Sequence, residues 1–279
     1  MSDPRSDPLP DPLLDPLVPD TPPVAASPSI SEPVMVVEPV PTIPAATVVV
    51  VRPSIAPTSM GPPAAGSGID VLLLRRNAKL AFAGGHWVFP GGRVDLADRR
   101  DDDVSPDLDA ARRAAVREAA EEAGLILDAD ELVRFAHWTP PTMSNKRFAT
   151  WFFVTALPFD AGGITIDGGE IHEHTWIGPA EALRRCDAGE IELSPPTWIT
   201  LEYLSLFDAV DPLLAHASKQ PVGYFATRIA AIDDAIVALY DGDAGYDESD
   251  ASLSGTRHRL WMRSSGWVYE RDDWPPPLN

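Results

Sequence analysis

Residues 117 to 125 read Arg-Glu-Ala-Ala-Glu-Glu-Ala-Gly-Leu, and three of their side chains are carboxylates at helical spacing. Glu118, Glu121 and Glu122 stand at positions i, i+3 and i+4, which share one face of an α-helix. Two carboxylates about 4 Å apart repel each other by roughly 1 kcal/mol in water and by about 4 kcal/mol at the effective dielectric of a protein surface. A divalent cation among the oxygens relieves that repulsion, and hard oxygen ligands favour Mg²⁺ or Mn²⁺ over Zn²⁺. The segment therefore predicts a metal site.

The flanking residues predict the helix that positions these carboxylates. Ser105 followed by Pro106 is typical of an N-cap and a first turn, and Gly124 is placed to end the helix. On the arc opposite the carboxylates we expect a packed apolar face made of Leu108, Ala115, Val116, Ala119, Ala120 and Ala123. The alternative is a solvated helix that is simply rich in exposed glutamate.

Upstream of this helix, a short apolar run from Trp87 to Phe89 ends in Pro90-Gly91-Gly92. Proline stops a strand ladder, and glycine lets the backbone come close to another group. The run therefore predicts a short strand that leads into a tight turn.

Together, the glycine turn and the acidic segment resemble the signature of the Nudix hydrolase family. That signature is Gly, five residues, Glu, seven residues, then Arg-Glu-U-x-Glu-Glu-x-Gly-U, where U is a bulky apolar residue. Gly92 stands at the opening glycine, and the closing block is matched by Arg117, Glu118, Glu121, Glu122, Gly124 and Leu125. Ala119 stands where a larger apolar residue is usual.

The spacing of the signature is longer in this chain than in the family. Gly92 and Arg117 are 25 positions apart, where the family pattern gives 14, so eleven residues are extra. Counting back from Arg117 places Asp109 at the first family glutamate and the insertion around residues 96–105. A polar loop tolerates added length because closure entropy grows slowly. This insertion resembles that of the peroxisomal acyl-CoA diphosphatases and their bacterial relatives.

The resemblance implies an enzyme that cleaves a nucleoside diphosphate linked to another group. Metal ions activate the attacking water and neutralise the charge that develops on phosphorus. As ligands of Mg²⁺ or Mn²⁺, the resemblance implies the carboxylates of Glu118, Glu121 and Glu122 and the backbone carbonyl of Gly92. Arg117, one turn before Glu121, is expected to orient that carboxylate.

A further acid is expected from a loop outside the helix. Glu170 lies six residues before Trp176, where some family members place a metal-binding or base glutamate, and Glu173 is a second candidate. Either residue could instead belong to a solvated turn. Arg147-Phe148 resembles an Arg-Phe pair of the relatives with the inserted loop, which implies a substrate contact, although the Asp that commonly follows it there is replaced by Ala149.

The elements around these motifs predict a mixed sheet between helices, an α/β (α+β) class. Strands are expected at Thr47–Arg52, Ile69–Arg75, Trp87–Phe89, Leu132–Trp138, Phe148–Ala156, Ile164–Asp167 and Ile171–Ile177, and helices at Pro179–Cys186 and Pro196–Phe207. The resemblance implies that residues 45–210 form a Nudix α/β/α sandwich. Residues 211–279 are expected to pack on it as an extension, with a helix at Ala226–Leu239 and a β-hairpin of His258–Arg263 with Trp267–Arg271.

The composition limits the partners of the chain. Residues 1–44 hold 13 of the 30 prolines and −6 of the net charge of −20, which predicts a disordered acidic tail. The remaining −14 argues against binding of duplex nucleic acid, whose affinity comes from neutralising phosphates. No signal peptide or membrane span is expected. A single cysteine, Cys186, excludes an intramolecular disulfide and fits a reducing cytoplasm.

Two classes of function remain open from the sequence. The first is a pyrophosphohydrolase that acts on coenzyme A or acyl-CoA, ADP-ribose, a nucleotide sugar or a nucleoside triphosphate. The second is a catalytically silent Nudix-fold module that binds a nucleotide as a sensor. The three intact glutamates favour the enzyme, because a binding module has no need of three mutually repelling acids. The oligomeric state is left open.

Overall fold

The computed structural model describes residues 40–54, 68–79, 83–158, 163–232 and 235–272. The expected tail of residues 1–44 lies outside this part of the chain except at its end. There the first strand, β1, begins at Thr42, so residues 42–44 belong to a sheet rather than to a disordered tail.

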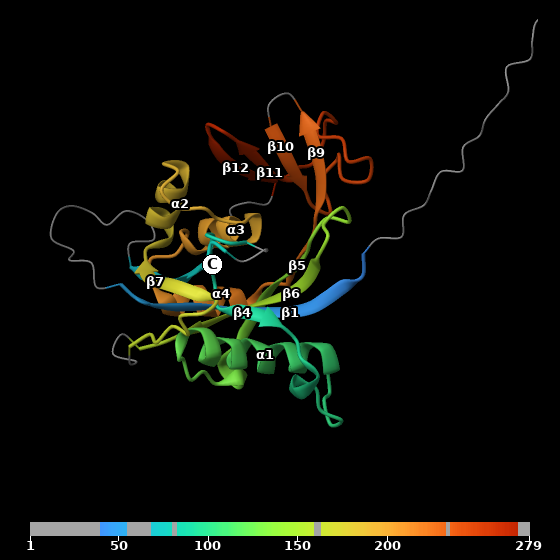
Figure 1. The fold of residues 1–279 in the computed structure, drawn as a ribbon. Coiled ribbons are helices and arrows are strands. Elements are labelled where there is room, and N and C mark those ends of the chain that lie inside the picture. The colour runs from blue at the N-terminus through green and yellow to red at the C-terminus, as the bar shows by residue number, and fades with distance from the viewer. Residues whose placement is uncertain (1–39, 55–67, 80–82, 159–162, 233–234, 273–279) are drawn as a thin grey trace, which may run out of the picture. The chain divides into compact units, whose positions relative to one another are not determined.

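A mixed sheet of eight strands forms the centre of the fold (Figure 1). Its main path runs through β3(Trp87–Val88), β2(Ile69–Arg76), β1(Thr42–Pro53), β6(Arg147–Ala156), β5(Val133–Thr139) and β8(Gly223–Ala226), while β4(Gly91–Arg93) pairs with β1 and β7(Ile171–Ile177) pairs with β2. β1 is parallel to β6 and antiparallel to β2 and β4. Val48 to Val51 are all fully buried, as expected of a central strand that is covered on both faces.

Helices cover both faces of this sheet, which confirms the predicted fold class. One face packs against α1(Pro106–Ala123). The other face packs against α2(Pro179–Asp187), α3(Pro195–Leu204) and α4(Val210–Lys219). Figure 1 shows α1 on one side of the sheet and α2 and α3 on the other. None of the described helices has the length and apolar character needed to cross a membrane.

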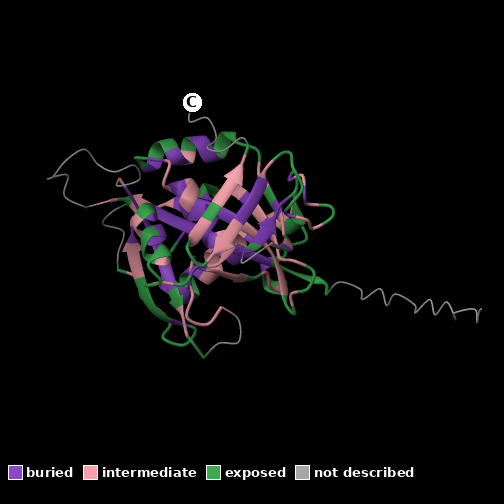
Figure 2. Ribbon diagram, turned by 90° about the horizontal axis from the view of Figure 1, so that it is seen from above, coloured by how far each residue is buried: buried purple, intermediate pink, exposed green. Residues whose placement is uncertain are grey.

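Burial follows the layers (Figure 2). Buried residues run along the central strands, and the helices are buried on one side and exposed on the other. Cys186 in α2 is half-buried, and burial raises the pKa of its thiol, which disfavours the reactive thiolate.

A second sheet follows the domain in the chain and differs from the prediction. It consists of β12(Gly266–Arg271), β11(His258–Arg263), β10(Ala235–Leu239) and β9(Arg228–Ile232), paired in that order. The hairpin of β11 and β12 was expected, but the helix at residues 226–239 was wrong, because this stretch forms β9 and β10. The spacing of its apolar residues fits both the helical period of about 3.6 residues and the strand period of two. The stretch forms strands because β10 pairs with β11, which is distant in the sequence.

The predicted strand at residues 164–167 was also wrong. This segment pairs with no strand in the described part of the chain. Ile164 and Ile166 pack against the core beside α1, and the Thr165 N–H donates to the Ala123 carbonyl at 3.0 Å. Its alternating apolar residues therefore serve to cover the end of a helix and do not extend the sheet.

The extension joins the domain through β8, which the sequence did not reveal. β8 lies parallel to β5 at the edge of the eight-stranded sheet. Phe225 of β8 stacks on Trp138 of β5 with ring centroids 3.9 Å apart, and Tyr240 contacts the same Trp138 ring edge-on at 5.7 Å. The second sheet therefore shares the core that lies under α3 and α4.

Candidate active site

The acidic helix α1 begins and ends where the sequence predicted. Ser105 is its N-cap and Pro106 lies in its first turn, although the Ser105 hydroxyl makes no capping hydrogen bond. Instead, the Ser105 N–H donates to Asp109 Oδ2 at 2.9 Å. At the other end Gly124 closes the helix with φ +66°, a conformation that glycine adopts without strain.

The predicted packed face of α1 is confirmed for Ala115, Ala119 and Ala123, with Leu108 and Val116 packed against them, but this face is not opposite the glutamates. Ala115, Glu118, Ala119 and Glu122 stand at i, i+3, i+4 and i+7 and form one stripe, and this stripe faces the sheet. Glu122 is only 6% exposed, whereas Ala120, which was expected in the core, is exposed. Two of the three carboxylates are therefore drawn toward the core, and Glu121 alone points outward.

Glu122 is a buried carboxylate at the glycine turn. Its Oε2 accepts a hydrogen bond from the Gly91 N–H at 2.9 Å. Burial raises the pKa of Glu122 to about 8, and the charges of Glu118 and Glu170 act in the same direction, while the Gly91 N–H and Arg76 oppose them. Without a cation nearby, the protonated form of this side chain is favoured at neutral pH.

This shift predicts how the metal-free protein responds to pH. The carboxyl pKa is higher in the folded state, about 8 against an ordinary 4.5, so stability is present at acidic pH and is lost as the pH rises toward 8. The slope from this one group is at most about 1.4 kcal/mol per pH unit. Glu122→Gln should remove it, as urea unfolding in EDTA across pH would show; parallel curves for the two proteins would contradict the prediction.

Glu118 lies beside Gly92, and its position explains why that residue is glycine. A methyl group on Gly92 would overlap the Glu118 carboxylate. β4 holds Gly92 in place through its pairing with Ala46 of β1. Burial also raises the pKa of Glu118, and its hydrogen bond with Arg117 opposes that shift.

Arg117 connects two of the glutamates. Its Nη1 donates to Glu118 at 2.9 Å and to Glu121 at 3.1 Å, while Nη2 donates to the Arg93 carbonyl at 3.0 Å. The sequence suggested the Glu121 contact only. One guanidinium thus fixes the relative position of both carboxylates.

Asp98 holds Arg117, a contact that was not predicted from the sequence. The carboxylate of Asp98 is buried and accepts from Arg117 Nε at 3.2 Å and Nη2 at 2.9 Å. Counting forward from Gly92, five residues and then an acid, leads to Asp98 and would have found it. Asp109, reached by counting backward, caps the start of α1. All eleven extra residues therefore lie between Asp98 and Arg117.

Glu170 and Arg76 form the opposite side of the candidate site. Arg76 Nη2 donates to Glu170 Oε2 at 3.1 Å, and both charges act on Glu122. Arg76 is mostly buried, with its Nε unpaired among the described residues. The sequence analysis overlooked Arg76 because an arginine at a strand end carries no signal by itself. Glu173 pairs with Arg75 at 3.2 Å instead.

Arg147 and Phe148 are not brought to this site. Arg147 donates to the carbonyls of Pro140, at 3.2 and 3.1 Å, and of Val40, at 2.9 Å. In β6 it pairs with Thr42, four residues from Ala46, the partner of Gly92. At about 3.3 Å per residue, that separation is roughly 13 Å along the strand.

The carboxylates of Glu118, Glu121 and Glu122 have the chemistry of divalent-cation ligands, but they do not yet converge on one point. Among the described residues no three His, Cys, Asp or Glu side chains already surround one point. Glu118 and Glu121 are turned to Arg117, and Glu122 is turned to the Gly91 N–H. All the atoms that these carboxylates offer as ligands are nevertheless hard oxygens, which suits Mg²⁺ or Mn²⁺.

Comparison with known proteins shows what the central part of the chain is similar to. Residues 63–195 match the NUDIX domain. A Caenorhabditis elegans protein that carries the name nudix hydrolase 7 is 28% identical over 170 residues, which cover 48% of this chain and 55% of that protein. This chain therefore spans little more than half the length of that relative.

A solved structure shares the fold. The NUDIX hydrolase from Alicyclobacillus acidocaldarius is 23% identical and superposes with a TM-score of 0.55 over 65% of this chain and 99% of its own. The mixed sheet and its covering helices are therefore similar in fold to that structure, and residues 63–195 match the NUDIX domain that the signature residues resemble.

Proposed function

We propose that this chain is a metal-dependent pyrophosphohydrolase that cleaves the diphosphate bond of a nucleoside diphosphate linked to another moiety. The observation that carries the proposal is the pair of desolvated carboxylates, Glu118 and Glu122, one helical turn apart at the Gly91-Gly92 turn. Burying such a pair is costly unless a cation joins it. A pure binding module would gain nothing from that cost.

Each residue of the site then has a definite task. Glu118, Glu121 and Glu122, with the Gly92 carbonyl, would hold Mg²⁺ or Mn²⁺, which supplies Lewis acidity and lowers the pKa of bound water. The Arg117 side chain keeps the Glu118 and Glu121 oxygens in place. Glu170, an exposed acid that pairs with Arg76, would accept the proton of the attacking water.

Arg76 is proposed to hold a phosphate of the substrate. Its position beside Glu122 supports this, and a guanidinium binds phosphate through paired, charge-assisted hydrogen bonds. Arg76→Ala should raise KM by roughly tenfold or more, since a hydrogen bond to a charged group contributes about 1.5–3 kcal/mol. Arg75→Ala is the matched control, because Arg75 is half exposed and pairs with Glu173. Equal KM values for the two variants in steady-state kinetics would contradict the assignment.

The substrate class is tested by a panel of diphosphates. The insertion after Asp98 favours coenzyme A or acyl-CoA, and ADP-ribose, nucleotide sugars and nucleoside triphosphates are the alternatives. Each is incubated with Mg²⁺, with Mn²⁺ or with EDTA, and the cleaved products are measured by chromatography. We expect cleavage of at least one class that requires metal and is lost in Glu122→Gln.

The sensor module is the second candidate. This alternative is supported by the hydrogen bonds of Glu118 and Glu121 to Arg117, because these two carboxylates do not converge on one cation position. Nucleotide binding by calorimetry, with no cleavage of any panel member in either metal, would favour the sensor over the enzyme.

A further inference from the structure

We propose that Asp103, in the segment that lengthens the Nudix signature, is a positioning residue for the metal-binding glutamates. The inference rests on the proposed function. A continuous chain of ion pairs and hydrogen bonds runs from Asp103 through Arg113, Asp98 and Arg117 to Glu118 and Glu121. Asp103 touches neither the substrate nor the metal and acts through this chain.

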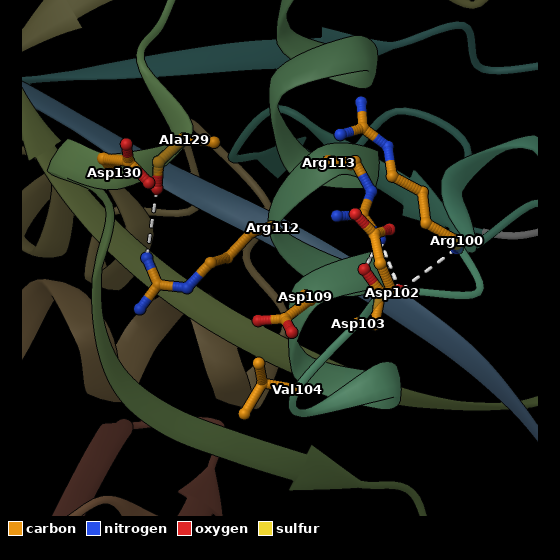
Figure 3. Close-up of a pocket in the computed structure, with 9 residues that line it drawn as sticks. All are labelled: Arg100, Asp102, Asp103, Val104, Asp109, Arg112, Arg113, Ala129 and Asp130. Atoms are coloured by element: carbon orange, nitrogen blue, oxygen red, sulfur yellow. Dashed lines mark hydrogen bonds and ion pairs between the residues drawn. The ribbon is translucent and has the colours of Figure 1, made fainter.

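The first link joins the inserted segment to α1. Arg113 Nη2 donates to both oxygens of Asp103, at 2.7 Å and 2.5 Å, and the Arg100 N–H donates to the same carboxylate at 3.1 Å. The Asp103 side chain is only 4% exposed. Figure 3 shows Arg113 extending from α1 to Asp103 on the wall of a hollow of about 210 Å³. The Asp103 carboxylate is therefore covered and bonded to both the inserted segment and α1.

The second link joins α1 to Asp98. Arg113 Nε donates to the Asp98 carbonyl at 2.6 Å, while Arg117 takes the Asp98 carboxylate. Arg113 and Arg117 are one turn apart on the same side of α1. Both arginines therefore bind Asp98: Arg113 binds its backbone carbonyl, and Arg117 binds its carboxylate.

Removing the Asp103 charge should disturb the glutamates in a definite way. Arg113 would lose its anion, and we expect it to turn to the carboxylate of Asp98, whose carbonyl it already binds. Competition for Asp98 would release Arg117, which would then pair more fully with Glu118 and Glu121 and compete with the metal. Groups that orient metal ligands from outside typically change metal affinity or activity by roughly 10–100-fold.

The experiment titrates metal-free protein with Mn²⁺ alone, by calorimetry, so the readout does not depend on turnover. Asp103→Asn should weaken Mn²⁺ binding about tenfold. Asp103→Glu, which keeps the charge, should restore most of the affinity, and Asp102→Asn is the matched control, because the neighbouring Asp102 is exposed. Wild-type affinity in Asp103→Asn would overturn the proposal.

A second variant guards against misfolding of the first. Arg113→Lys keeps the charge but lacks the fork that binds both Asp103 and the Asp98 carbonyl, so it should weaken Mn²⁺ binding to a similar degree. If Arg113→Lys and Asp103→Asn both bind Mn²⁺ as Asp102→Asn does, while the diphosphates are still cleaved, the positioning role is rejected and the proposed function stands. Mn²⁺ binding with the expected losses but without cleavage would reject the proposed function and support the positioning role.

Discussion

Replacing Glu122 with glutamine should lower kcat by at least about 100-fold, because under the proposed function it removes a direct metal ligand, and loss of groups that only orient metal ligands already costs up to about that much. The buried site accepts glutamine without collapse. At neutral pH the metal-free carboxyl is mainly protonated, with a pKa of about 8, so glutamine has nearly the same shape and charge. The Gly91 N–H can donate to the amide oxygen as it does to Oε2.

Steady-state kinetics with the substrate found in the panel measures the effect. Glu131→Gln is the matched control, since Glu131 is an exposed glutamate in the short helical turn after α1. The circular dichroism of both variants should equal that of the wild type. Turnover by Glu122→Gln within a few-fold of the control would remove Glu122 from the catalytic site.

Breaking the buried ion pair of the second sheet should have the largest effect on stability. Arg259 and Asp243 are joined by two hydrogen bonds of 2.7 Å and 2.6 Å, with side chains 1% and 0% exposed. Both side chains make further hydrogen bonds. Asp243 accepts from the Gly245 and His258 N–H groups, and Arg259 donates to the Ala251 carbonyl. Asp243→Asn leaves a buried guanidinium without its counter-charge, which costs about 3–5 kcal/mol of unfolding free energy.

Urea denaturation compares this variant with Glu173→Gln, which removes one member of the exposed Arg75–Glu173 pair. Exposed pairs contribute only about 0–1 kcal/mol. The double variant Asp243→Leu with Arg259→Met should recover part of the loss, because it leaves no unpaired charge. If Asp243→Asn is as stable as Glu173→Gln, the ion pair does not hold the second sheet in place.

The acidic helix α1 was predictable because its signals are local. Ser105, Pro106 and Gly124 mark its ends, and the spacing of the glutamates defines one side of it. The burial of Glu122 was not predictable in the same way. The stripe that contains Ala115 and Ala119 also contains Glu118 and Glu122, and only contact with the Gly91-Gly92 turn shows that acids can occupy a packed face.

Residues that depend on distant contacts escaped prediction. Arg76 matters because β2 ends beside the loop that carries Glu170, and nothing in the order of residues brings those two together. Residues 228–232 and 235–239 are strands because β10 pairs with β9 and with β11, which lies about twenty residues further along the chain. Asp98, in contrast, was within reach, since it lies at the family spacing from Gly92.

Titration of the metal-free wild-type chain with Mn²⁺, followed by calorimetry, tests the central claim most directly. We expect saturable binding that is lost when Glu118 and Glu122 are both replaced with glutamine, with the fold retained. Absence of a binding heat in the wild type, or equal binding in the double variant, would contradict a catalyst built on these two buried carboxylates.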